Sequence, residues 1–131
     1  MDNPGVLQGV TQLFTNPHAH VVRSIALFVL VATLGATILI TWLRKKNAPK
    51  VVVYSHGLLA VSGLLVLLYY AFTHPTTSPK LAIGLFIAAA LGGIYMFLTS
   101  GPDKAKPIPI AGLHALLAVS GLVTLLVYVF G

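Results

Sequence analysis

The chain of 131 residues contains no cysteine. This absence excludes disulfide bonds, iron–sulfur clusters, covalently attached c-type haem and thiol catalysis. Acidic residues are almost as scarce, since Asp2 and Asp103 are the only two. Both lie outside the long apolar runs, so the chain lacks the buried carboxylate with which many coupled transporters bind and release a proton or cation. The sequence also has no Ser–His–acid set, nucleotide-binding loop or metalloprotease motif, and hydrolytic catalysis has no support.

Charged residues make up only 8% of the chain and hydrophobic residues 57%, whereas a typical soluble domain has about 25% charged residues. Such a chain has too little polar surface to cover a water-soluble body. Four apolar runs have the length of about 18 to 25 residues that crosses a bilayer as a helix. They cover about residues 21–43, 51–72, 81–98 and 108–130. We therefore predict an all-α fold, an integral membrane four-helix bundle that forms one domain over residues 1–131.

A shorter helix is expected before the first span, over about residues 4–15. Pro4 is suited to the first turn of a helix, and Asp2 or Asn3 can cap it. The apolar residues between Val6 and Phe14 fall on one face at helical spacing. The segment predicts an amphipathic helix that lies on the outer membrane surface, and the alternative is a mobile tail.

Most of the basic residues lie in two of the three connections between the spans. The net charge of +6 therefore bears on the orientation of the chain in the membrane. The six residues concerned are Arg44, Lys45, Lys46, Lys50, Lys104 and Lys106. By the positive-inside rule these connections face the cytoplasm, so that both termini face outward. This asymmetry and the small size favour a bacterial inner membrane. Nucleic-acid binding is not expected, because the chain has no soluble domain to present a basic surface.

One segment is repeated: "SHGLLAVSGLLVLLYYAF" at residues 55–72 is similar to "LHALLAVSGLVTLLVYVF" at residues 113–130. The shift is 58 positions (114 − 56), and it also pairs Phe28 with Phe86 and Gly35 with Gly93. The pattern indicates a tandem duplication of a two-helix hairpin, with units at about residues 16–73 and 74–131. Each unit crosses the membrane twice, so the copies have one orientation and a pseudo-twofold axis along the membrane normal is expected.

His56 and His114 occupy the same place in the two copies, at one depth on two parallel helices. An ionisable side chain inside a bilayer is costly and indicates a functional site. Haem takes two axial imidazoles on opposite faces, and four-helix bundles build such sites from facing helices. Zinc and copper require more ligands than this pair supplies. Small residues follow each histidine on the same helix face and are expected to leave a slot for the macrocycle: Ala60 and Gly63, Ala118 and Gly121.

The alternative is a purely structural pair. Small residues on membrane helices also allow close packing, and a polar side chain among them can hold helices together by hydrogen bonds. One duplication event then accounts for both histidines. In that case the chain is a non-catalytic structural or assembly subunit of a larger membrane complex.

Three further histidines, His18, His20 and His74, gather near the outer end of the spans. The repeat does not match them with histidines in the other copy. His20 at the start of the first span and His74 at the end of the second define a possible second haem site. With the inner haem, it would form a path for electrons across the bilayer.

In His56 and His114, and in the "LLAVSG" that follows each, the chain resembles the small four-helix membrane cytochromes b. The resemblance implies haem b held between transmembrane helices and electron transfer to or from quinones, periplasmic partners or other electron-transfer subunits. Since the sequence shows no extramembrane domain to oxidise or reduce a substrate, we expect an electron-transfer component without a catalytic site of its own.

Overall fold

The computed structural model describes residues 4–15 and 19–131, and this part of the chain is helical apart from its connections. A short helix, α1, spans Pro4–Thr15. Four long helices follow: α2 at Ala19–Leu43, α3 at Lys50–Thr73, α4 at Lys80–Thr99 and α5 at Ile108–Phe130. All four are long and apolar enough to cross a bilayer, so the chain is an integral membrane protein.

The helix boundaries agree with the apolar runs to within two residues, and the prediction of four spans is confirmed. Prolines define three of the starts: Pro49, Pro79 and Pro107 come directly before α3, α4 and α5. Proline pushes the preceding residue out of helical geometry and lacks a backbone N–H, which the first turn of a helix does not need. Helix α1 is also present as predicted, with Val6 and Leu7 exposed. The rest of its predicted apolar face and its cap, Asp2 or Asn3, lie outside the described side chains.

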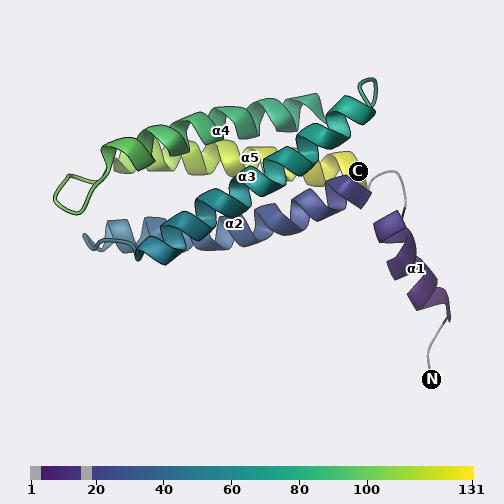
Figure 1. Cartoon of the computed structure of the whole chain (residues 1–131), viewed down its shortest axis with the longest axis horizontal. Coiled ribbons are helices and arrows are strands. Elements are labelled where there is room, and N and C mark those ends of the chain that lie inside the picture. The colour runs from purple at the N-terminus through teal and green to yellow at the C-terminus, as the bar shows by residue number, and fades with distance from the viewer. Residues whose placement is uncertain (1–3, 16–18) are drawn as a thin grey trace.

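The four spans pack as two hairpins, α2 against α3 and α4 against α5. Additional contacts between α2 and α5 and between α3 and α4 join the hairpins into a bundle. Figure 1 shows the α2–α3 and α4–α5 connections at one end of this bundle and the C-terminus at the other. We call the former the basic end, since it carries Arg44, Lys45, Lys46, Lys50, Lys104 and Lys106, and the latter the terminal end.

The packed core lies toward the terminal end. Its buried residues are Val21, Phe28, Leu67, Tyr70, Ala82, Phe86 and Leu125. At its centre the rings of Phe28 and Phe86 stack with their centroids 4.0 Å apart and their planes 10° from parallel. A hydrogen bond of 2.9 Å joins the hydroxyl groups of Tyr70 and Tyr128 nearer the end of the bundle. Both pairs link one hairpin to the other.

The half of the bundle toward the basic end is packed less tightly. Helix α2 has its last buried residue at Val31, and α3 has its first at Gly63. In the basic half of the other hairpin, Met96 and Ala111 are the buried residues that the described chain provides. Fewer buried residues are therefore found at and beyond the level of His56 and His114 than in the core.

Large apolar side chains cover the outside of the bundle. Leu58 is 70% exposed and Phe72 is 83% exposed, and many other leucines, valines and isoleucines are similar. A water-soluble monomer rarely exposes continuous apolar surface on this scale. In a bilayer the same surface faces lipid tails, which is consistent with four membrane spans.

The turn that follows α2 has one residue in the left-handed region, Lys45, with φ of 58°. The amide of Lys46 donates to the carbonyl of Thr41 (3.0 Å), and the amide of Lys45 donates to that of Trp42 (2.9 Å). This is the Schellman pattern, in which glycine is the preferred residue at the left-handed position.

Lys45→Gly is therefore expected to stabilise the protein by about 1 kcal/mol, because it removes the steric cost of a side chain in the left-handed region. Thermal unfolding in mild detergent, followed by circular dichroism, measures the change. Lys46→Gly is the matched control, since Lys46 has no positive φ. If both variants lowered the melting temperature equally, Lys45 would not be the strained residue of this cap.

Candidate cofactor site

His56 and His114 lie at the same position on two helices, each as the seventh residue, on α3 and on α5. Both side chains are half-buried. Their ring centroids are 6.2 Å apart and their planes differ by 68°. The structure therefore brings together the two histidines that the repeat singles out, across the interface between the hairpins.

Each imidazole is anchored through Nδ1 to a backbone carbonyl of the neighbouring helix. His56 Nδ1 lies 2.9 Å from the carbonyl oxygen of Val31, and His114 Nδ1 lies 2.7 Å from that of Ala89. A carbonyl oxygen can only accept, so Nδ1 carries the proton and donates it. In the neutral imidazole, Nε2 then has a free lone pair.

The two Nε2 atoms have no hydrogen-bond partner among the described residues. Neither is a fully buried polar atom without a partner, so accessible space adjoins both. An anchored ring with an unprotonated, accessible Nε2 is the form in which histidine binds metals, and the Nδ1–H bond to a carbonyl fixes ring orientation and tautomer.

The separation of the rings is compatible with one metal ion between them. A bond between a metal ion and an imidazole nitrogen is about 2 Å long, so two imidazoles on opposite sides of one ion have ring centres roughly 6 Å apart. The observed separation is 6.2 Å.

Two glycines make room for the imidazoles. A Cβ atom built on Gly35 would lie 2.9 Å from Cε1 of His56, and one built on Gly93 would lie 3.2 Å from Cε1 of His114. Each glycine follows, by one helical turn, the residue whose carbonyl accepts the Nδ1 bond: Val31 or Ala89. The missing side chain lets the ring approach the backbone of the neighbouring helix.

Gly35→Ala should displace the His56 ring and destabilise the protein by about 1 to 3 kcal/mol, the usual cost of overpacking. Gly93→Ala should cost less, because the added atom would be 0.3 Å farther from its imidazole (3.2 − 2.9). Gly57→Ala is the control: nothing lies within 4 Å of its added Cβ, and the higher helix propensity of alanine should stabilise the protein by up to about 1 kcal/mol. Thermal melts of the three variants test the order, and equal stability of Gly35→Ala and Gly57→Ala would contradict it.

An open slot was expected beside the small residues that follow each histidine, but two of these residues have phenyl rings next to them. Gly63 and Gly121 are buried, and an added Cβ would lie 3.1 Å from the ring of Phe28 or Phe86, respectively. The phenyl rings thus occupy the space beside these glycines. Ala60 and Ala118 are half-buried, one turn closer to the histidines.

Sequence reasoning about the site missed the residues on α2 and α4. Gly35 and Gly93 adjoin the imidazoles, whereas Phe28 and Phe86 stack on each other and lie against Gly63 and Gly121. A signal for them was present, because the shift of 58 pairs Gly35 with Gly93 and Phe28 with Phe86.

The outer histidines lie against different tyrosines. His20 contacts the edge of Tyr69, with ring centroids 5.4 Å apart, whereas His74 stacks on Tyr70 at 4.4 Å. His74 Nδ1 is also 2.9 Å from the hydroxyl oxygen of Thr73. His18 lies outside the described residues. Within the described part of the chain, no group of three or more histidine, aspartate or glutamate side chains could hold a metal ion. A second haem at this end stays a prediction.

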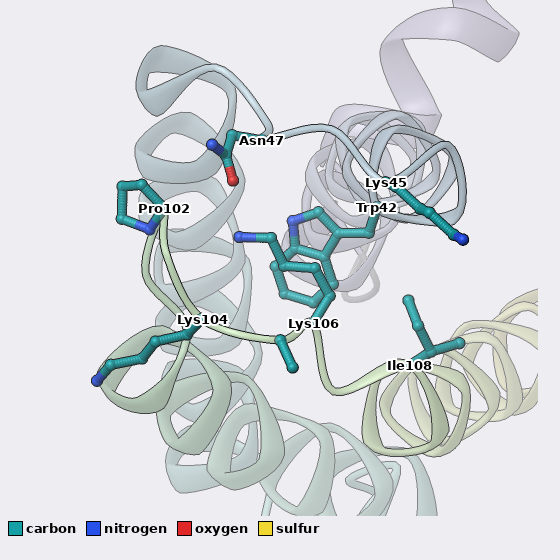
Figure 2. A pocket seen from close by; sticks show the side chains of 8 residues that line it. Trp42, Lys45, Asn47, Pro102, Lys104, Lys106 and Ile108 are labelled. Atoms are coloured by element: carbon teal, nitrogen blue, oxygen red, sulfur yellow. The ribbon is translucent and has the colours of Figure 1, made fainter.

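A cavity of about 370 Å³ opens at the basic end, between the α2–α3 and α4–α5 connections (Figure 2). Its lining residues are Trp42, Lys45, Asn47, Pro102, Lys104, Ala105, Lys106 and Ile108. The Nζ atom of Lys106 donates a 2.9 Å hydrogen bond to the carbonyl of Gly101 and lies 5.7 Å from the centre of the Trp42 ring. Figure 2 shows the ends of Lys45 and Lys104 extending away from Trp42.

Comparison of the chain with protein-family models, with curated proteins and with solved structures gives no match.

Proposed function

We propose that the chain is a membrane b-type haem protein, a cytochrome or cytochrome subunit, that holds haem b between His56 and His114 and serves in electron transfer. The observation that carries the proposal is the imidazole pair: two rings 6.2 Å apart, each anchored at Nδ1 and free at Nε2. Haem brings four equatorial nitrogens of its own, so two axial imidazoles complete its coordination.

Other metal centres fit this site less well. Structural and catalytic zinc need three or four protein ligands, and copper sites usually need three or more. The four spans contain no cysteine, aspartate or glutamate, so the histidine pair has no further strong ligand nearby. A cofactor that supplies most of its own ligands is the group that two histidines can hold.

The contacts across the hairpin interface support a pseudo-twofold arrangement of two duplicated units. Phe28 stacks on Phe86, and each of these residues is 58 positions from the other, as His56 is from His114. The bonded hydroxyl groups of Tyr70 and Tyr128 have the same offset, as do the acceptors Val31 and Ala89. The pseudo-twofold axis would pass between the two members of each pair. A cofactor with two equivalent faces could lie on that axis and meet the same residue from each unit.

The protein would supply ligation, orientation and an apolar shell, while haem supplies one-electron chemistry when bound. Because nearly all of the described chain is membrane-spanning helix, we infer that its redox partner is a membrane quinone or another electron-transfer subunit. The charge asymmetry supports the cytoplasmic side for the basic end, with both termini outside, in a bacterial inner membrane.

The visible spectrum of the protein purified in mild detergent tests the proposal. We expect one haem b per chain and a low-spin bis-histidine spectrum that responds to dithionite. Two haems per chain would bring His20 and His74, with His18, into a second site. A protein that stays colourless when it is expressed with added haem would contradict the proposal.

A second candidate function has its own support. Both Nδ1 bonds join the two helices of one hairpin, α3 to α2 and α5 to α4, as a structural hydrogen bond between membrane helices would. The chain would then be a colourless assembly subunit that co-purifies with partner chains. Its expected signature is loss of thermal stability, without any spectral change, when either histidine is replaced.

A further inference from the structure

We propose that the cavity at the basic end, with Lys106 as its fixed cation, is the site that receives the two propionates of the haem. This inference rests on the proposed function, and it names the part of the chain that recognises the anionic edge of the cofactor.

The cavity lies on the correct side of the histidine pair and at a suitable distance. Trp42 follows Gly35, which contacts His56, by seven residues on α2, about 10 Å at 1.5 Å per residue. Residues seven apart lie on the same helix face, so Trp42 continues the face that meets the imidazole. On α5, Ile108 precedes His114 by six residues, about 9 Å. The cavity is therefore the next space beyond the histidines toward the basic end.

The opposite direction is closed and apolar. The stacked rings of Phe28 and Phe86 and the core residues beyond them fill the bundle toward the terminal end. A carboxylate buried among these side chains would lose its hydration without a charged partner, and such burial is costly. A haem between the imidazoles must therefore direct its two carboxylates toward the basic end.

The charges of the cavity suit two carboxylates. Lys45, Lys104 and Lys106 line it from both connections, and no acidic residue is part of the lining. Within the described chain, none of these lysines forms an ion pair. Lys106 is held in place by the carbonyl of Gly101 and by the Trp42 ring, and its ammonium group retains donors for an anion. The side chains of Lys45 and Lys104 are long enough to turn inward when an anion is present.

A comparison of haem with haem dimethyl ester, in which both propionates are neutral, isolates the contact. Each ligand is titrated into the haem-free protein in nanodiscs of neutral phosphatidylcholine, and binding is followed by the Soret band. Wild type should bind haem at least about tenfold more tightly than the ester, since hydrogen bonds between charged groups are the strong ones. The double variant Lys104→Gln, Lys106→Gln should bring that ratio close to one.

Two internal controls keep the result interpretable. Lys46→Gln, Lys50→Gln removes the same charge from the same end without altering the cavity lining, and it should preserve the tenfold ratio. The ester itself should bind the Lys104, Lys106 variant as well as wild type, which shows that the variant is folded.

Other outcomes overturn the inference. An unchanged affinity ratio in the Lys104, Lys106 variant would mean that the propionates lie elsewhere. If the Lys46, Lys50 variant lost the affinity ratio to the same extent, the effect would come from the overall positive charge of this end and not from the cavity. Native mass spectrometry in phosphatidylglycerol supplies a third outcome: an unchanged ratio together with lysine-dependent retention of this lipid would assign the cavity to a lipid phosphate. If neither haem nor its dimethyl ester bound to the wild-type protein, the proposed function itself would be wrong.

Discussion

Replacing either His56 or His114 with alanine is expected to abolish low-spin haem binding, with loss of the Soret band in the purified protein. Each alanine would remove one of the two imidazoles proposed to hold the haem iron, and a single imidazole would not by itself keep that iron low-spin. The two variants should behave alike, because both rings have the same position on their helices and the same type of Nδ1 anchor. The measurement is haem per chain and the oxidised and reduced spectra.

Two further variants make this prediction specific to ligation. His114→Met places a thioether where an imidazole was, and a mixed histidine–methionine haem should be retained at a higher midpoint potential. His20→Ala and His74→Ala change histidines at the terminal end and should leave the inner haem bound. If alanine at position 56 or 114 only lowered the melting temperature of a colourless protein, the histidines would be structural hydrogen-bonding groups.

The spans and their boundaries could be predicted from the sequence, because two physical requirements determine them. A helix must contain about 20 apolar residues to cross the hydrocarbon core, and the chain must leave helical geometry before a proline. Pro49, Pro79 and Pro107 provide those breaks directly before three helices. The pairing of His56 with His114 was also predictable, since the repeat places them at equal depth.

Which side of each helix faces the core and which faces lipid could not be predicted from the sequence. In water an amphipathic pattern marks the buried face, but in a bilayer the lipid-facing side of a helix is as apolar as the core side. The repeat pairs Phe28 with Phe86, but it pairs Phe72 with Phe130 in the same way, although Phe28 is buried and Phe72 is 83% exposed. For this reason the stacked phenyl pair was found only in the structure.

The same limit applies to the glycines. Gly63 and Gly121 were recognised as small residues on the histidine face, and an open slot beside them was the expectation. What lies beside a glycine depends on a second helix, and here the rings of Phe28 and Phe86 approach them. Sequence periodicity describes one helix at a time, so it identifies a small residue without identifying its neighbour.

Phe28→Ala and Phe86→Ala should be the most destabilising single substitutions in the core, each by about 3 kcal/mol or more. Each ring is buried, stacks on the other and lies against a glycine of the following helix in its own hairpin, so its removal leaves a cavity that the backbone cannot easily fill. Phe72→Ala is the control, and it should change stability little because its ring is exposed. Thermal or denaturant unfolding in detergent, with and without added haem, gives the three values.

The double variant Phe28→Ala, Phe86→Ala tests whether the two rings act as one unit across the hairpin interface. Stacked aromatic pairs contribute about 0.5 to 1.5 kcal/mol beyond the burial of each ring, so the double variant should cost less than the sum of the single ones by about this amount. Strict additivity would mean that each ring stabilises only its own hairpin, through Gly63 or Gly121. A measured coupling would instead show that the phenyl pair holds the two hairpins together.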